Sequence, residues 1–156
     1  MEKKANNEDK IMWKVMIVDD EKLICKLVQA LVEWDKLGMQ MAAQAENAIQ
    51  ALDMLQQYRP DILITDIRMP GMDGLELIKN AKKICPELEI IIISGYAHFE
   101  YARNALSLGV GNYLLKPIKQ DELNETLRKI GERLDAKKSA QGMETVSYTH
   151  LRAHET

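Results

Sequence analysis

Five short apolar runs alternate with amphipathic segments along most of the chain, and this alternation restricts the fold more than any other feature. The apolar runs are residues 14–18, 39–45, 61–65, 88–94 and 112–115. The segments with apolar residues at helical spacing are residues 21–34, 48–58, 74–84, 98–108 and 120–134. Apolar strands that are each followed by a helix are typical of a parallel sheet covered on both faces. Because such crossovers are right-handed, we predict an α/β fold with a doubly wound, five-stranded parallel sheet in the order 2-1-3-4-5 and five helices.

Apolar stripes predict which sides of two helices face the core. The stripe of the first helix consists of Leu23, Leu27, Leu31 and Trp34. The stripe of the last helix consists of Leu123, Leu127, Ile130 and Leu134. Asn47 directly precedes the second helix, where its side chain is expected to cap the first turn.

The composition excludes several classes of protein. The chain has 156 residues and a formal net charge of -3, so it has room for one domain and no polybasic surface for nucleic acid or membranes. No apolar run is long enough to cross a bilayer and no signal peptide is seen, so we expect a cytoplasmic protein without membrane contact. The cysteines, Cys25 and Cys85, lack the spacing of a metal site and are expected to be reduced thiols.

Charged and polar residues follow the predicted strands at the edge where such folds bind ligands. Asp19 and Asp20 follow the first strand, and Asp66 follows the third. Ser94 ends the fourth strand, and Lys116 follows the fifth. Because the carboxyl ends of parallel strands meet at one edge, we expect these side chains to converge beside strands one and three.

Each of these residues also has an ordinary role when it is taken alone. Asp19 or Asp20 could cap the first helix, and Asp66 could cap a turn. Ser94 could be a loop hydroxyl and Lys116 a solvated charge. Carboxylates held together, however, repel and raise one another's pKa unless a cation neutralises them. An oxygen-only ligand set without nearby Cys or His favours Mg2+.

Four motifs at these strand ends resemble those of the receiver domain of two-component response regulators. They are IVDDE, ITDIRMPGMDG, IIISG and YLLKPI, in this order along the chain. The resemblance covers residues 14–134, and the flavodoxin-like receiver fold agrees with the sheet predicted from the apolar runs. The segments ISGYAHFEYARNALSLGVGNYLLKPI and LVEWDKLGM most resemble receivers that precede an AraC-type helix-turn-helix domain.

The resemblance implies a role for each residue of the site. Asp66 would be the phosphoacceptor, receiving a phosphoryl group from a phosphohistidine of a sensor histidine kinase. Asp20 and Asp66 would bind Mg2+ directly, Asp19 would bind it through water, and the backbone carbonyl of Arg68 would be a further ligand. Lys116 would contact the phosphoryl oxygens. The chain would be a regulatory module rather than an enzyme, catalysing at most its own phosphorylation and dephosphorylation.

The resemblance also implies a conformational switch. On phosphorylation, the Ser94 hydroxyl would move to the phosphoryl group, and Tyr113 would turn inward behind it. This movement would reshape a surface that in the family also supports homodimers. The surface consists of residues 98–108, 112–115 and 120–134. Tyr113 could equally be an aromatic residue that only packs at the sheet edge. The Lys116–Pro117 peptide is expected to be cis, as in the family.

The two ends of the chain are predicted to lie outside the domain. Residues 1–13 are expected to form a disordered leader, and residues 135–156 a disordered tail without amphipathic period. Residues 146–156, VSYTHLRAHET, resemble a translated transposon-end sequencing adaptor and are therefore given no function. Contact with DNA is expected only through an output domain that this chain does not contain.

Four functions are compatible with the sequence. The first is a receiver that controls transcription through an output domain, and its alternative is a stand-alone receiver that signals through protein contacts. The third is a phosphatase with an aspartyl-phosphate intermediate, but Arg68 stands where those enzymes usually have a second acid. The fourth is a flavodoxin-like nucleotide-binding protein, but no glycine-rich phosphate loop follows the first strand.

Overall fold

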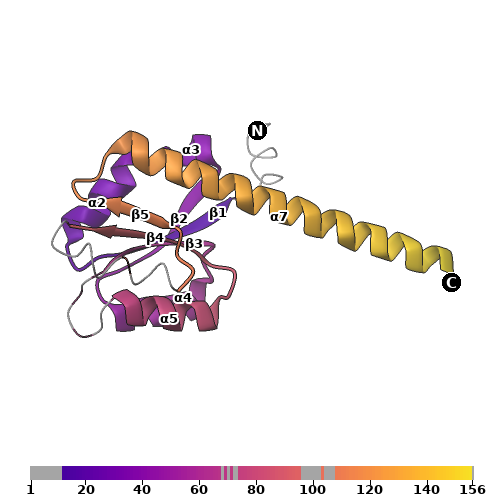
Figure 1. The fold of residues 1–156 in the computed structure, drawn as a ribbon, viewed down its shortest axis with the longest axis horizontal. Coiled ribbons are helices and arrows are strands. Elements are labelled where there is room, and N and C mark those ends of the chain that lie inside the picture. Colours follow the sequence, from indigo (N-terminus) through magenta and orange to yellow (C-terminus); the bar gives the residue numbers. More distant parts are fainter. Residues whose placement is uncertain are drawn as a thin grey trace, which may run out of the picture.

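The computed structural model describes residues 12–67, 69, 71, 74–95, 103 and 108–155, with side chains described up to residue 140. Five parallel strands form one sheet in the order β2-β1-β3-β4-β5 (Figure 1). The strands are β1 (Trp13–Val18), β2 (Met39–Ala45), β3 (Ile62–Asp66), β4 (Glu89–Ser94) and β5 (Asn112–Leu115). The order confirms the predicted doubly wound topology, and every strand end lies within one residue of its predicted position.

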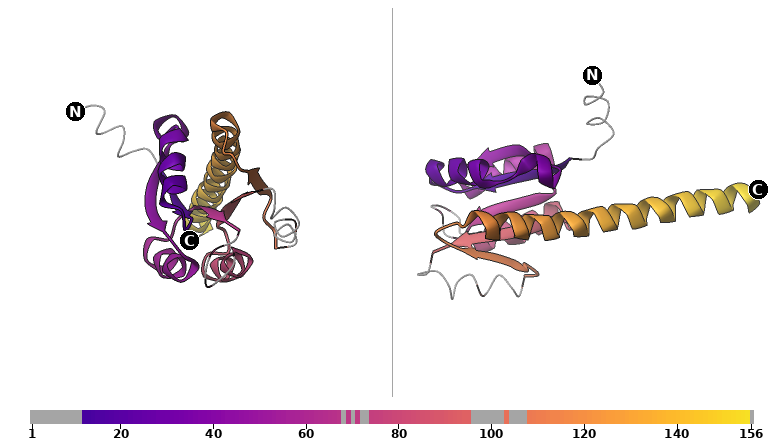
Figure 2. Two further views of the ribbon diagram at one scale, coloured as in Figure 1. Left: turned by 90° about the vertical axis from the view of Figure 1, so that its left-hand side faces the viewer. Right: turned by 90° about the horizontal axis from the view of Figure 1, so that it is seen from above.

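Helices cover both faces of the sheet, as the apolar strands predict (Figures 1 and 2). The helices of the described residues are α2 (Lys22–Leu31), α3 (Trp34–Leu37), α4 (Ala48–Tyr58), α5 (Gly74–Ile84) and α7 (Gln120–Glu155). α4 and α5 pack on one face of the sheet, whereas α2, α3 and α7 pack on the other. The predicted helix at residues 98–108 lies almost entirely outside the described residues.

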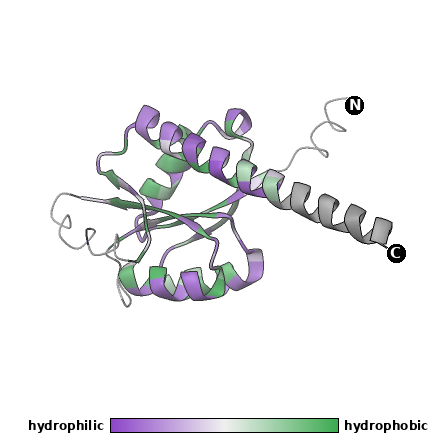
Figure 3. Cartoon of the chain, turned by 45° about the vertical axis from the view of Figure 1, so that its right-hand side comes forward, coloured by the Kyte–Doolittle hydropathy of each residue, from purple (hydrophilic) through white to green (hydrophobic). Residues whose placement is uncertain are grey.

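The sheet separates two apolar cores, because successive side chains of a strand point to opposite faces. Along β1, Met16 and Val18 pack towards α4 and α5, whereas Val15 and Ile17 pack towards α2 and α7. Figure 3 shows strands that are largely hydrophobic and helices whose outward surfaces are mostly hydrophilic. Burial on both faces explains why the strands are apolar throughout, and it holds their carboxyl ends in fixed positions.

Two local predictions for the helices are confirmed. The predicted stripe of α7 is buried over its whole length, at Leu123, Leu127, Ile130 and Leu134. The Asn47 side chain accepts a hydrogen bond from the backbone N–H of Gln50 at 2.8 Å and so caps α4. α4 ends at Tyr58, and the left-handed backbone of the capping residue Arg59 (φ 49°) turns the chain into Pro60 before β3.

The predicted inward side of the first helix is wrong at its start. Leu23 is 77% exposed and Leu27 is 40% exposed, whereas Cys25 and Val28 are fully buried against the sheet. α2 is apolar on more than one side, so the spacing of its leucines did not identify the side that packs. The helix also ends before Trp34, which begins the separate short helix α3.

Both ends of the described chain differ from the sequence-based expectation. Trp13, which is expected in a leader, is the first residue of β1, and residues 1–11 lie outside the described part. α7 continues to Glu155 and projects away from the sheet (Figure 1), whereas the sequence predicts a disordered tail from residue 135. Residues 135–155 contain no proline and many helix-favouring residues, so the helix continues there without an amphipathic period.

None of the helices in the described ranges combines the length and the apolar character that a membrane span requires. α7 is the longest of them, with 36 residues, and charged residues occur along its whole sequence.

Candidate functional site

The sheet register places Asp19 beside Asp66. Val18 of β1 pairs with Thr65 of β3, so the next residue of each chain segment lies at the same carboxyl edge of the sheet. Asp20 follows Asp19 in the short loop that leads into α2. Each of the three carboxylates offers an oxygen within 4.8 Å of the others. The acidic cluster expected from the sequence is therefore brought together by the fold.

The acids of this cluster differ in exposure. Asp19 is 2% exposed and Asp66 is 7% exposed, whereas Asp20 is exposed to solvent. Burial is the main cause that raises the pKa of Asp19 to about 6. The backbone N–H of Glu21, which donates to Asp19 Oδ1 at 2.9 Å, opposes this rise, and the charge of Asp66 adds to it. A further cation at this edge would favour the charged form of Asp19.

Lys116 brings a positive charge to the acidic cluster from the end of β5. Its Nζ lies 3.4 Å from Asp66 Oδ2 and 3.6 Å from Asp19 Oδ2. A longer contact of 3.9 Å reaches the more exposed Glu21. Burial acts to lower the pKa of Lys116, but the charges of Asp66 and Asp19 outweigh it and raise that pKa. Lys116 is therefore held in its charged form, and its peptide with Pro117 is cis, as expected.

The Asp66 carboxylate is oriented by contacts on both of its oxygens. The backbone N–H of Ile67 donates to Oδ1 at 2.7 Å, and Lys116 approaches Oδ2. The Thr65 hydroxyl donates to the backbone carbonyl of Asp66 at 2.9 Å. These contacts fix the direction of the side chain at the end of a strand whose residues are all buried.

Gly74 lets the start of α5 approach the strand end that carries Asp66. Its backbone N–H donates to the carbonyl of Ile67 at 2.6 Å. A Cβ at this position would lie 2.7 Å from the carbonyl oxygens of Asp66 and Ile67, closer than packed atoms tolerate. A residue without a side chain is therefore required for α5 to begin this close to the backbone of Asp66 and Ile67.

The two predicted switch residues lie on neighbouring strands. Ser94 is fully buried, and its hydroxyl donates to the carbonyl of Gly95 at 3.2 Å. Its own carbonyl accepts from the backbone N–H of Lys116 at 2.8 Å, which ties the ends of β4 and β5 together. Tyr113 is half-buried and packs against the core on the side of α4 and α5. Arg68, the predicted source of a backbone ligand, lies outside the described residues.

The donor set of the acidic cluster fits a hard divalent cation. Asp19, Asp20 and Asp66 provide oxygen atoms only, and two of these residues are buried. Their combined negative charge exceeds the single positive charge of Lys116. Carboxylate oxygens at close range with room for water are the ligands that Mg2+ prefers, so the residues present are suited to that ion.

Two residues of this edge were not singled out from the sequence. Glu21 supplies a third acidic neighbour to Lys116, and it directly follows the Asp19–Asp20 pair, so its place in the sequence was the available signal. Gly74 is the last residue of the sequence motif ITDIRMPGMDG, but its contact with the backbone of Ile67 depends on how closely α5 packs. Spacing along the chain does not contain that information.

The doubly wound sheet, with its acidic edge and the lysine from β5, defines the receiver class of α/β domains. The chain belongs to the response regulator receiver domain family, whose family model matches residues 15–128. It is therefore a receiver domain of the two-component signalling type, as the four motifs indicate.

Similar proteins agree with this membership. The uncharacterized transcriptional regulatory protein YesN of Bacillus subtilis is 40% identical over 119 residues, which cover 76% of this chain and 32% of YesN. The transcriptional regulatory protein HptR of Staphylococcus aureus is 32% identical over 136 residues, covering 87% of this chain and 53% of HptR. The solved REC domain of AraT, a response regulator from Geobacillus stearothermophilus, has a TM-score of 0.79 at 38% identity, covering 82% of this chain and 99% of that domain.

The match covers only part of the curated relatives. The chain spans 32% of YesN and 53% of HptR, whereas it spans 99% of the separate AraT REC domain. The similarity therefore concerns the receiver domain, and it gives no direct information on the remaining parts of those regulators.

Proposed function

We propose that this receiver accepts a phosphoryl group on Asp66 from a phosphohistidine of a sensor histidine kinase. The observation that supports this proposal is the position of Lys116 Nζ, 3.4 Å from Asp66 Oδ2 and 3.6 Å from Asp19 Oδ2. One cation thus stands beside the acceptor carboxylate at the edge where doubly wound folds bind their ligands. The domain itself is proposed to comprise residues 14–134.

The transfer uses the fixed orientation of the acceptor side chain. A carboxylate oxygen of Asp66 forms a bond to phosphorus, the bond from phosphorus to the imidazole nitrogen breaks, and its electron pair stays on the imidazole. Ile67 N–H holds the carboxylate in one direction, so little reorganisation is needed for an in-line approach. Lys116 stabilises the negative charge that spreads over the phosphoryl oxygens during transfer.

Mg2+ is the proposed cofactor of this step. Asp20 and Asp66 would hold the ion directly, Asp19 would hold it through water, and the carbonyl of Arg68 would add a ligand. The bound ion supplies a further positive charge next to the phosphoryl oxygens. Lys116 offsets part of the negative charge of the cluster, because it contacts both buried carboxylates.

The proposed output is a change of surface controlled by Ser94 and Tyr113. Ser94 ends β4 next to the site, and Tyr113 lies on the adjacent strand, where Ile92 pairs with it. Movement of the Ser94 hydroxyl towards the phosphoryl group would open space for Tyr113 and alter the surface around β5 and α7, where homodimers could form. Since YesN and HptR are transcriptional regulatory proteins, we propose control of transcription through an output domain. A stand-alone receiver that acts through protein contacts is the alternative.

The phosphoacceptor assignment is tested with a small phosphodonor. Acetyl phosphate and Mg2+ should add one phosphoryl group to the wild-type chain, as measured by intact mass. Asp66→Asn should abolish the addition, whereas Asp53→Asn, which changes an exposed carboxylate on α4, should leave it unchanged. Stoichiometric labelling of Asp66→Asn, or no labelling of the wild type with or without Mg2+, would overturn the assignment.

A further inference from the structure

α7 is tied to the sheet at the edge opposite to the acidic cluster. Trp13, the first residue of β1, donates from its indole Nε1 to Asp135 Oδ1 at 2.8 Å, across 122 positions of sequence. Asp135 directly follows Leu134, where the buried stripe of α7 ends. The hydrogen bond therefore reaches α7 directly after the last residue whose side chain is buried against the sheet.

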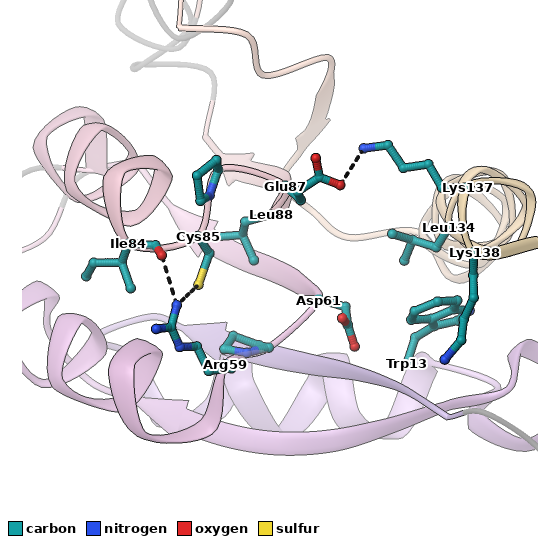
Figure 4. Close-up of a pocket in the computed structure, with 12 residues that line it drawn as sticks. Trp13, Arg59, Asp61, Ile84, Cys85, Glu87, Leu88, Leu134, Lys137 and Lys138 are labelled. Atoms are coloured by element: carbon teal, nitrogen blue, oxygen red, sulfur yellow. Dashed lines mark hydrogen bonds and ion pairs between the residues drawn. The ribbon is translucent and has the colours of Figure 1, made fainter. Parts of the chain in front are cut away.

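Two further contacts follow within one turn of the helix. Lys137 and Lys138 are neighbours in sequence but extend from α7 in different directions, towards Glu87 and along Trp13 (Figure 4). Lys137 forms an ion pair of 3.1 Å with Glu87, in the loop before β4. The ammonium of Lys138 lies over the Trp13 ring, 5.9 Å from its centroid. A cavity lined by both lysines has a volume of about 400 Å³ and is also lined by Leu134.

The contacts of this segment differ from those that hold the rest of α7. Residues 135–140 are all exposed, so burial of apolar surface contributes little to their helical state. Most of the stability of a helix in a protein comes from packing of its apolar face, so a segment without such packing is only marginally helical in water. Instead, this segment contacts β1 on one side and the loop before β4 on the other.

We propose that Trp13, Glu87, Asp135, Lys137 and Lys138 form an exit clamp, which keeps α7 helical beyond Leu134 and sets the direction in which it leaves the domain. The hydrogen bond between Trp13 and Asp135 is the central contact of the exit clamp, because the Trp13 ring also lies under the Lys138 ammonium. The exit clamp is formed in the unphosphorylated chain and does not depend on the proposed phosphoryl transfer. The exit clamp thereby fixes the orientation of the receiver relative to any segment that continues from α7.

Hydrogen exchange of backbone amides tests the exit clamp, and the two tryptophans offer a matched pair. Trp13→Phe removes the N–H donor and keeps an aromatic ring, so exchange of amides in residues 135–140 should accelerate about fivefold. Trp34→Phe removes an indole N–H that donates to the Gln29 carbonyl at 3.0 Å, far from the exit. This control should leave the exchange of residues 135–140 unchanged, and both variants should preserve the protection of residues 123–134.

Alanine variants on α7 separate the exit clamp from helix propensity. Asp135→Ala introduces a better helix former, so propensity alone would slow exchange after residue 134. Loss of the exit clamp predicts the opposite result, an acceleration similar to that of Trp13→Phe. Glu132→Ala is the control, since Glu132 pairs with Arg128 of the same helix.

Three results would overturn the exit clamp. One is unchanged or slower exchange of residues 135–140 in both Trp13→Phe and Asp135→Ala. Another is exchange at the rate of an unfolded peptide in the wild type. The third is an equal acceleration in the Glu132→Ala control. Labelling by acetyl phosphate, measured on the same variants, should match the wild type, whereas no labelling of the wild type itself would count against the phosphoacceptor assignment alone.

Discussion

The Lys116 ammonium lies 3.4 Å from Asp66 Oδ2, although 50 positions separate the two residues in sequence. The same ammonium lies 3.6 Å from Asp19 Oδ2, so one cation contacts two buried carboxylates, one directly after β1 and one at the end of β3. The Asp19 and Asp66 carboxylates have oxygens within 4.8 Å of each other, and two negative charges this close repel strongly in a poorly solvated site. Lys116 therefore reduces the repulsion between the acids, in addition to its proposed contact with the phosphoryl group.

Removal of the Lys116 charge should slow phosphorylation more than it perturbs the fold. Lys116→Met keeps a long apolar side chain but removes the charge that would stabilise the transferring phosphoryl oxygens. Loss of one such stabilising group lowers rates by about 100-fold or more. The rate of labelling by acetyl phosphate measures the effect, with Lys119→Met as the control at an exposed position. Equal rates in Lys116→Met and the wild type would refute the role of Lys116 in transfer.

The raised pKa of Asp19 predicts how the metal-free protein responds to pH. The folded state holds this proton up to about pH 6, whereas the unfolded chain releases it near 3.8. Since the folded state binds more protons between these values, the free energy of unfolding should fall as pH rises from about 4 to about 7. The shift corresponds to roughly 3 kcal/mol at most. Urea unfolding in the presence of a chelator measures this dependence.

Two controls separate Asp19 from the other titrating groups. Asp19→Asn removes the titration, so its stability relative to the wild type should increase as pH rises through about 6. Mg2+ should reverse the loss in the wild type, because it neutralises the ionised carboxylates. A stability difference between Asp19→Asn and the wild type that stays constant from pH 4 to 7 would contradict the prediction.

The acidic edge could be predicted because it depends on strand order alone. Once β1 and β3 are neighbours in a parallel sheet, Asp19, which follows β1, and Asp66, the last residue of β3, lie at the same edge. Strand order also places Lys116 at this edge, but β5 is two strands away from β3, so its contact with Asp66 depends on the conformation of its long side chain. The distances between these side chains and the pKa of Asp19 depend on burial, which the sequence does not give.

Other features could not be predicted because more than one packing was compatible with the sequence. The leucines of α2 and the pair Cys25 and Val28 are both apolar stripes, and only contact with the sheet distinguishes them. The length of α7 was missed because its last turns lack an amphipathic period. The contact of Asp135 with Trp13 was also not predictable, because it is a single hydrogen bond between residues far apart in sequence.

The two cysteine thiols should differ sharply in reactivity. Cys25 is fully buried below the acidic edge, and burial raises the pKa of its thiol to about 11. Because the thiolate is the reactive form, Cys25 should resist alkylation at pH 8. Cys85 is half-buried and should react with iodoacetamide under the same conditions. Peptide mass spectrometry assigns the modified residue, and both thiols should react after denaturation. Faster modification of Cys25 than of Cys85 in the folded protein would contradict this order.

Replacement of Gly74 should destabilise the fold, whereas replacement of another glycine should not. Gly74→Ala places a methyl group 2.7 Å from the backbone of Asp66 and Ile67, so α5 must shift away. Overpacking of this kind costs about 1–3 kcal/mol. Gly111→Ala is the control, because no atom lies within 4 Å of the added Cβ. Urea unfolding compares the two variants, and equal stability of both would show that α5 adapts without cost.

Asn124 should be the most costly asparagine to replace among the described residues. It is 8% exposed on α7 and bridges the break between α2 and α3. Its amide donates to the Leu31 carbonyl at 2.8 Å, and its oxygen accepts from the Glu33 backbone N–H at 2.8 Å. Asn124→Ala removes this partner from two part-buried backbone groups, which should cost about 1 kcal/mol. Asn80→Ala is the control, because the Asn80 amide contacts only the Glu76 carbonyl one turn earlier in α5. A loss of stability in Asn124→Ala no larger than in Asn80→Ala would mean that water replaces the bridge.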